Sequence, residues 1–293
     1  MSILYGIPYL GSKTKIAPNI INILPSGERF VDLFGGGFAM SHCARLSGKY
    51  KSVLYNELNP LLPPLIRDAL DGKYNYNVFK PRFITRKEFE ERKDIDGYVR
   101  YIWSFGNQGE SYMFSKELEP LKHEAHDFVV FGKPTTHFKV VEKFVTSKDI
   151  HKRRIQFCGY CRSHKRFDLQ QLQQLQQLER LERLQQLERL EQLEQLERLI
   201  TINRGSYDEY EYQDGDIVYC DPPYEGTEDY GNAFDHEKFY EWVATRPYQV
   251  WFSSYQGVKG FKLVWAKRLR STYGTGNKAV NYECLYTGGK IND

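Results

Sequence analysis

Short apolar runs alternate with stretches of helical periodicity along both ends of the chain. Strands are predicted at residues 30–33, 52–56, 217–220 and 248–255, and a strand that continues into a loop is predicted at residues 199–210. Residues 235–246 predict a helix with Asp235 as its N-cap. Residues 261–288 predict two strands around a Gly-rich loop. Strands that alternate with helices favour an α/β fold, with a mostly parallel sheet and an antiparallel hairpin at one edge.

The middle of the chain has weaker patterns. Residues 59–100 predict helix, and residues 98–117 are rich in aromatic residues and glycine, which is typical of core packing near a bend. The alternation in residues 137–145 (HFKVVEKFV) is β-like. Together these residues predict a smaller, mainly helical region inserted between the two halves of the sheet.

Residues 169–199 are a low-complexity repeat in which leucine occurs at every third position, eleven times. On an α-helix a three-residue step turns by about 300°, so these leucines spiral around the helix and form no coiled-coil seam. Three structures remain open: a helix buried on several sides, a helix with a spiral apolar stripe, or short stacked turns as in a solenoid. We favour the helix. The repeat could also be tolerated in a surface helix that has no specific binding role.

Charge and cysteine content narrow the class of protein. The chain has 293 residues, 41% of them hydrophobic, and a net charge of +3. A basic cluster spans residues 151–166, contains no acid, and includes Arg153, Arg154, Arg162 and Arg166. It is typical of a phosphate-binding surface, although a solvated basic loop fits the charge equally well.

The five cysteines are too few and too scattered for a disulfide framework. Cys158 and Cys161 form a C-x-x-C pair, which we interpret as two thiols on a strand and turn rather than as a zinc site, and no metal is predicted. The N-terminus has no signal-peptide pattern, and no apolar run reaches membrane-spanning length. We therefore expect a cytoplasmic protein without a membrane partner.

The first candidate for chemistry is the glycine turn of residues 30–40 (FVDLFGGGFAM). A strand, this turn, a helix, a second strand and Glu57 follow one another, as in nucleotide-binding α/β units. Met40 stands where the third glycine of G-x-G-x-x-G would be, which argues against a pyrophosphate site. A nucleoside whose ribose hydroxyls bind Glu57 still fits.

The second candidate is the segment 216–226 (DIVYCDPPYEG), where a buried strand ends in an acid, two prolines and an aromatic residue. Asp221 supplies a carboxylate acceptor, Pro222 a carbonyl group, and Tyr224 a flat face. These three groups suit a planar ring that carries an amino group. If they accept the amino hydrogens, the nitrogen lone pair becomes available to attack a methyl sulfonium, and catalysis needs mainly positioning and fixed dipoles.

The set of motifs resembles the Dam-like class of DNA adenine methyltransferases, especially phage-borne members. The matching pieces occur in the order of that family: YGIPYLGSKTKIA, FVDLFGGGFAM, YNELNP, YIWSFGN, DIVYCDPPY and WFSSY. The resemblance implies S-adenosylmethionine (SAM) as methyl donor, adenine in double-stranded DNA as acceptor, and base flipping. It also leaves room for a restriction endonuclease as partner.

The resemblance further implies roles for individual residues and regions. Tyr9, which stands where bacterial Dam enzymes carry Trp, and Lys13 would contact the donor, and Glu57, in place of the commoner Asp, would bind its ribose. Asp221 would touch both donor and target amine. The donor pocket would be shaped by Asp32, Phe34, Gly35 and Gly37. Residues 1–58 and 200–293 would form the catalytic domain and residues 59–168 the target-recognition region. The leucine repeat of residues 169–199, which lies between the recognition region and the DPPY segment, is the main departure from the family and is taken as a segment of its own.

Two other classes of function remain open from the sequence. One is methylation of a different amine, in RNA adenine, cytosine or protein glutamine, although Asp221 favours adenine over cytosine, where Ser is more usual in the family. The other is a non-catalytic module that binds DNA and recruits a partner through the leucine repeat.

Overall fold

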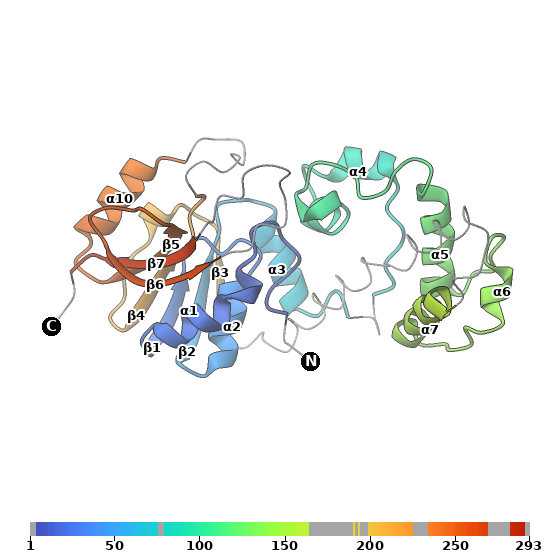
Figure 1. The fold of residues 1–293 in the computed structure, drawn as a ribbon, viewed down its shortest axis with the longest axis horizontal. Coiled ribbons are helices and arrows are strands. Elements are labelled where there is room, and N and C mark those ends of the chain that lie inside the picture. The colour runs from blue at the N-terminus through green and yellow to red at the C-terminus, as the bar shows by residue number, and fades with distance from the viewer. Residues whose placement is uncertain are drawn as a thin grey trace. The chain divides into compact units, whose positions relative to one another are not determined.

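The computed structural model describes residues 4–75, 79–163, 190, 193, 199–224, 234–268 and 282–290. The chain divides into two compact units (Figure 1). The first contains Met1–Gly6, Lys13–Pro63 and Arg198–Asp293, and the second contains Ile7–Ser12 and Pro64–Glu197. The first unit holds the sheet, and the second is built from helices.

One seven-stranded sheet organises the first unit. Its strands are β1 (Gly27–Asp32), β2 (Tyr50–Asn56), β3 (Ile200–Asn203), β4 (Asp216–Cys220), β5 (Val250–Tyr255), β6 (Lys262–Arg268) and β7 (Tyr282–Gly288). They lie in the order β3-β2-β1-β4-β5-β7-β6. The first five are parallel, and β7 pairs antiparallel with both β5 and β6. The predicted Rossmann-like methyltransferase sheet with an antiparallel hairpin at one edge is confirmed, with strand ends shifted by a few residues.

Helices cover both faces of this sheet, as parallel strands require. Helices α1 (Ala17–Ile23) and α2 (Ala39–Ser47) pack on the face that carries Phe30 and Tyr219. Helix α10 (His236–Thr245) packs on the opposite face, and its residues Phe239 and Val243 join a second apolar cluster. The predicted cap is confirmed, because the Asp235 side chain accepts a hydrogen bond of 2.9 Å from the Lys238 amide.

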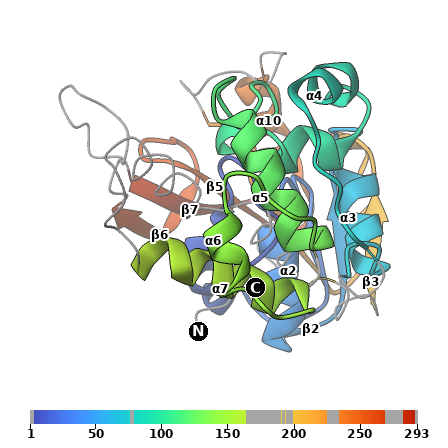
Figure 2. The same ribbon diagram turned by 90° about the vertical axis from the view of Figure 1, so that its right-hand side faces the viewer.

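The region between β2 and β3 is helical. Its elements are α3 (Leu62–Leu70), α4 (Arg86–Arg92), a π-helix η2 (Tyr98–Ile102), a 3-10 turn η3 (Phe105–Asn107), α5 (Glu119–Phe131), α6 (Lys139–Glu142) and α7 (Ile150–Ser163). Helices α5, α6 and α7 lie together (Figure 2), and the Phe128 and Phe157 rings of α5 and α7 are 6.0 Å apart. The predicted helix within residues 59–100 is confirmed by α3 and α4.

The β-like interpretation of residues 137–145 is wrong, because this segment contains helix α6. Its buried side chains are Phe138, Val141 and Val145. They recur at intervals of three and four, which is the period of a helix and not of a strand. Two adjacent valines within a short amphipathic segment produced the false alternation.

The strand-and-turn interpretation of Cys158 and Cys161 is also wrong, and the described part of the basic cluster, residues 151–163, is helix and not loop. Both cysteines lie on α7, where their side chains are buried. A spacing of three places them on one side of a helix. Within the part of the chain that the structure describes, no group of three or more His, Cys, Asp or Glu side chains is placed to hold a metal ion.

Most of the leucine repeat lies outside the described residues, so its conformation stays a prediction. Three of its leucines are described: Leu190 and Leu193 are fully buried, and Leu199 is exposed. Among the helices that the structure describes, none has the length and apolar character needed to span a membrane.

Candidate functional site

The order in which strands are added to the sheet reverses between β1 and β4. Strands β2 and β3 extend the sheet on one side of β1, and β4 and β5 extend it on the other. In open α/β sheets, ligands bind at the carboxyl ends of the strands at such a switch point. Asp32 ends β1, Glu57 follows β2, and Asp221 follows β4.

The glycine turn is fixed to the end of β2. The Gly35 amide donates to the Asn56 carbonyl at 2.9 Å, and the Tyr55 hydroxyl donates to the Gly36 carbonyl at 2.8 Å. A Cβ atom at Gly35 would lie 2.1 Å from the Tyr55 ring, so only glycine fits there. A Cβ atom at Gly6 would lie 2.2 Å from the Gly37 carbonyl oxygen. The N-terminal segment therefore crosses directly over the turn, a contact that the sequence analysis missed.

Glu57 is tied to the same turn. One carboxylate oxygen accepts from the Gly36 amide and the other from the Asn59 amide, each at 2.8 Å. Burial raises the pKa of Glu57, and these backbone hydrogen bonds oppose the rise. Phe34 leaves the turn on the other side and stacks on Tyr207, with ring centroids 5.3 Å apart. Phe34 thus packs into an apolar cluster, while Glu57 stays at the strand end.

Asp32 is a buried acid with one unused oxygen. Its Oδ2 accepts a 2.7 Å hydrogen bond from Ser41, whereas Oδ1 has no hydrogen-bond partner among the described residues. Burial raises the pKa of Asp32 to about 7, and the nearby charges of Asp221 and Glu57 add to the rise. A buried, unpaired acceptor is costly to stability, so this atom is suited to a ligand with a cationic or donor group.

Four side chains from distant segments meet beyond β4. The Lys13 ammonium lies 2.8 Å from Asp221 Oδ1, 3.4 Å from Glu283 Oε1 and 4.6 Å from the centroid of the Tyr224 ring. The Tyr224 hydroxyl is hydrogen-bonded to Asp221 Oδ1 at 3.1 Å and to Glu283. We call these residues, Lys13, Asp221, Tyr224 and Glu283, the clamp cluster.

Burial and charge act against each other in the clamp cluster. Burial lowers the pKa of Lys13, but the two carboxylates outweigh it and raise that pKa above its ordinary value. Burial raises the pKa of Glu283, with Asp221 adding to the rise and Lys13 opposing it. Burial also raises the pKa of the Tyr224 phenol well above its ordinary value, so the phenol stays protonated. Glu283 is a member that the sequence analysis missed.

The prolines of the clamp have different surroundings. The Pro223 carbonyl oxygen is 2.8 Å from Nε2 of His236, at the start of α10, which fixes the chain after the clamp. No described residue donates a hydrogen bond to the Pro222 carbonyl. The Pro222 oxygen therefore remains available as an acceptor with respect to the described residues.

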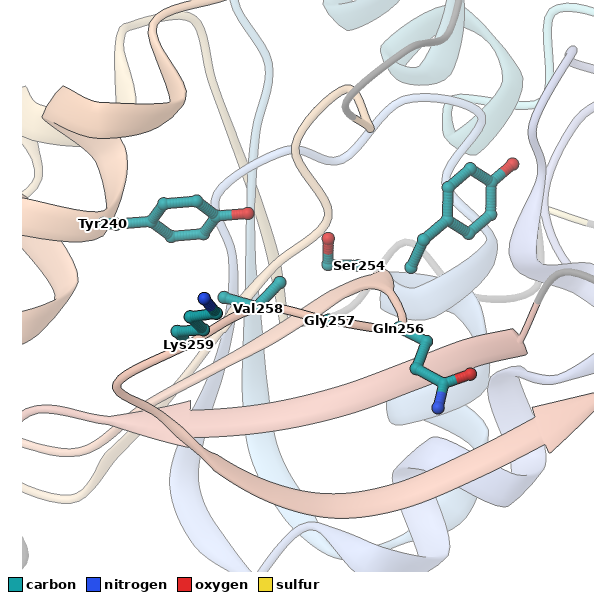
Figure 3. A pocket seen from close by; sticks show the side chains of 7 residues that line it. Tyr240, Ser254, Gln256, Gly257, Val258 and Lys259 are labelled. Atoms are coloured by element: carbon teal, nitrogen blue, oxygen red, sulfur yellow. The ribbon is translucent and has the colours of Figure 1, made fainter.

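A pocket of about 400 Å³ opens at the carboxyl end of β5 (Figure 3). Its lining residues are Tyr240, Ser254, Tyr255, Gln256, Gly257, Val258 and Lys259. Figure 3 shows Tyr240 projecting from a helix toward the strand that carries Ser254. The Tyr255 ring packs edge-on against Tyr224 at 4.6 Å, so the pocket adjoins the clamp cluster. The sequence carried a weak signal for this pocket: residues 248–255 predict a strand, and the end of that strand lies next to the end of β4, which precedes Asp221–Tyr224.

Tyr9 and the arginines lie in other surroundings. Tyr9 belongs to the second unit, where its ring meets Tyr101 at 5.3 Å. Arg153 on α7 donates to the Val130 carbonyl at 2.7 Å, and burial lowers its pKa. Arg154 is half-buried on the same helix. Arg162 is also on α7, but its side chain lies outside the description, as does all of Arg166.

Comparison with known proteins identifies the family of this chain. A family model described as D12 class N6 adenine-specific DNA methyltransferase matches residues 9–245. The match includes the glycine turn, Glu57 and the DPPY segment, whereas Glu283 lies beyond it. Comparison with curated proteins finds no match. Because the family match spans most of the sequence, the chain belongs to the D12 class of N6 adenine-specific DNA methyltransferases.

Proposed function

We propose that Asp221, Pro222 and Tyr224 hold an extruded adenine base, while Lys13, Asp32, Glu57 and the glycine turn hold SAM. The enzymes of this family methylate the 6-amino group of adenine in DNA, and SAM is the donor that the family implies. The observation that carries the assignment of residues is the clamp cluster, in which Lys13 fixes Asp221 at the end of β4, next to the end of β1.

The clamp suits an aromatic amine. The Asp221 carboxylate and the Pro222 carbonyl would accept the two amino hydrogens, which localises the nitrogen lone pair for attack. Tyr224 supplies an aromatic face, and the adjoining pocket of about 400 Å³ lies within the range of small-molecule sites. Asp221 would then take the proton that the nitrogen loses after methylation. The chain needs no covalent nucleophile for this reaction, only positioning and fixed charge.

The first unit offers groups that fit SAM, which when bound supplies a methyl group activated by its positively charged sulfur. The unpaired Oδ1 of Asp32 is an acceptor for a cationic donor group such as its α-ammonium. Glu57 retains acceptor capacity for ribose hydroxyls, because a carboxylate offers about four acceptor sites and backbone amides of Gly36, Leu58 and Asn59 use three of them. Gly35 and its neighbours permit close approach of the ligand to the backbone.

Extrusion of a base leaves a gap in the stack, and proteins that distort DNA frequently insert an apolar side chain between base steps. In the second unit, Phe105 is 61% exposed, which is unusual for a large aromatic residue. Its turn is rigid, because Asn107 donates to the Tyr101 carbonyl at 2.7 Å and the Gly109 amide donates to Ser104 at 2.9 Å. An aromatic ring on a rigid turn is suited to insertion into the base stack.

We assign the remaining roles on the same basis. Residues 1–58 and 200–293 form the catalytic domain, residues 59–168 recognise the target, and residues 169–199 form a distinct repeat segment. Tyr9 contacts the donor from the N-terminal motif, and Arg154, Arg162 and Arg166 bind DNA phosphates, whereas Arg153 holds the end of α5. A restriction endonuclease partner is compatible with this activity.

Asp221→Asn is expected to lower the rate of methyl transfer to DNA by at least about 100-fold, because an amide cannot supply the negative charge. Incorporation of labelled methyl groups into duplex DNA measures the rate, and a melting curve checks the fold. The exposed Asp214→Asn is the matched control. Full activity of Asp221→Asn would remove the proposed role of this carboxylate.

Asp32→Asn is expected to weaken SAM binding and to stabilise the protein at pH 8 by about 1–4 kcal/mol. The raised pKa of Asp32 means that the folded wild type loses stability as the pH rises from about 4 through about 7. The gain should therefore shrink towards pH 4. Calorimetry and urea unfolding at several pH values measure both effects, with the exposed Asp71→Asn as control. Unchanged SAM affinity, or a variant less stable than wild type at pH 8, contradicts the assignment.

Phe105→Ala is expected to reduce base flipping without loss of the fold, because the removed ring is exposed and contributes little to the core. Fluorescence of 2-aminopurine placed at the target position reports extrusion of the base. Ile95→Ala, which truncates another exposed apolar residue of the second unit, is the control. If 2-aminopurine fluorescence rises as much when Phe105→Ala binds the DNA as when Ile95→Ala binds it, Phe105 is not the inserted side chain.

Neutralisation of Arg154 and Arg162 by Gln is expected to flatten the salt dependence of DNA binding by about one log–log unit per lost phosphate contact. Arg153 is left intact because its guanidinium stabilises the end of α5. Binding titrations across a range of salt concentrations measure the slope, with exposed Lys87→Gln as control. A slope equal to that of the wild type would show that the two arginines do not contact phosphates.

A further inference from the structure

Glu283 is a buried acid for which the assigned chemistry has no role. It lies on β7, in the antiparallel part of the sheet, and is 3% exposed. It also lies outside the region that matches the family. A buried carboxylate is costly unless charged or hydrogen-bonding partners compensate for it, so its partners are informative.

Those partners are the clamp residues themselves. Glu283 Oε1 is 3.4 Å from the Lys13 ammonium and is hydrogen-bonded to the Tyr224 hydroxyl. Asp221 Oδ1 takes the same two partners, at 2.8 Å and 3.1 Å. One ammonium group and one phenol are thus shared by two carboxylates.

Other titratable groups around Glu283 are neutral or at the surface. The Tyr219 phenol is buried and hydrogen-bonded to Ser253 at 2.6 Å. Tyr255 on β5 and Lys267 on β6 stand opposite Glu283 in the ladder. Lys267 is exposed and lies 3.3 Å from the Asn19 side-chain oxygen, so water screens its charge. The neighbouring Cys284 thiol is buried, and burial raises its pKa, so it stays protonated.

The sharing changes the charge of the site. Lys13 and Asp221 alone would form a neutral pair, and the ammonium would compete with an adenine amino group for the same carboxylate. With Glu283 ionised, the clamp cluster carries a net charge of about −1 in a site where burial strengthens electrostatic interactions.

We propose that Glu283 is a positioning residue for methyl transfer, which shares the Lys13 ammonium and the Tyr224 hydroxyl with Asp221 so that Lys13 does not neutralise Asp221 alone and the cluster stays net negative beside the adenine amino nitrogen. This inference rests on the proposed role of Asp221. As the nitrogen–carbon bond forms, the carbon–sulfur bond breaks and its electron pair stays on sulfur. The positive charge passes to the nitrogen, which then gives a proton to Asp221. A net negative cluster stabilises the nitrogen as this charge develops.

Glu283→Gln keeps the shape of the side chain and removes its charge. We expect kcat to fall about tenfold at neutral pH, with an unchanged KM for DNA, because a neutral cluster stabilises the transition state less. In the wild type, two carboxylates share one cation and titrate as a pair. Without the second carboxylate this coupling is lost, so the acidic limb of the pH profile of kcat should move down by about one pH unit.

Lys13→Gln supplies a test in the opposite direction. It leaves two neighbouring carboxylates without their cation, so one of them retains a proton to a higher pH and the acidic limb should move up. Carbon-13 NMR titration of the carboxyl groups in the protein without SAM measures the same shifts independently of turnover. Glu237→Gln, at an exposed position on α10, is the matched control and should leave the profile unchanged.

Three outcomes separate the possibilities. An unchanged kcat and acidic limb in Glu283→Gln overturn the inference, as does a lower kcat with a lower melting temperature and an unmoved limb, which marks a purely structural role. If Glu283→Gln fails to fold, an unmoved limb and unmoved carboxyl titrations in Lys13→Gln overturn it instead. If Asp221→Asn retains methyl transfer, the proposed function itself is contradicted. If Asp221→Asn is inactive but Glu283→Gln has the kcat and pH profile of the wild type, only the role of Glu283 is removed.

Discussion

The ion pair between Lys13 and Asp221 is the constraint on which the site depends. Its side chains are 11% and 18% exposed, so both charges have lost most of their hydration. Such a pair is tolerated only where the geometry is good and further hydrogen bonds satisfy the charges. Tyr224 and Glu283 supply these contacts. The pair thereby fixes the N-terminal segment against the ends of β4 and β7.

Acidic groups accumulate at this edge of the sheet at a cost to stability. Asp32, Glu57 and Glu283 all have pKa values raised by burial, and Asp221 adds to the rise at Asp32 and Glu283. A protein under selection for stability alone would not bury several like charges together. The arrangement suits the binding of a cationic methyl donor, whose charge offsets this repulsion when it is bound.

The errors in the sequence analysis have a common physical cause. Both wrong interpretations concern short segments, residues 137–145 and the residues around Cys158. The sequence of these segments did not show which side chains become buried. Period two and period 3.6 are hard to distinguish over fewer than ten residues. Contacts such as that between Phe138 and Phe157 select the helix, and these contacts join different elements.

Local patterns determined the strand–glycine turn–helix order, the α10 cap, the edge hairpin and the DPPY segment, because the backbone rules behind them act over a few residues. Parallel strands then require that Asp32, Glu57 and Asp221 share one edge, so the acids of the site could be predicted. Glu283 could not, since its partner Tyr224 lies 59 residues away and Lys13 near the other end of the chain. The same holds for Gly6 over Gly37 and for the pocket beside Tyr255. Only the tertiary structure decides such contacts, because they depend on which strands become neighbours in the sheet.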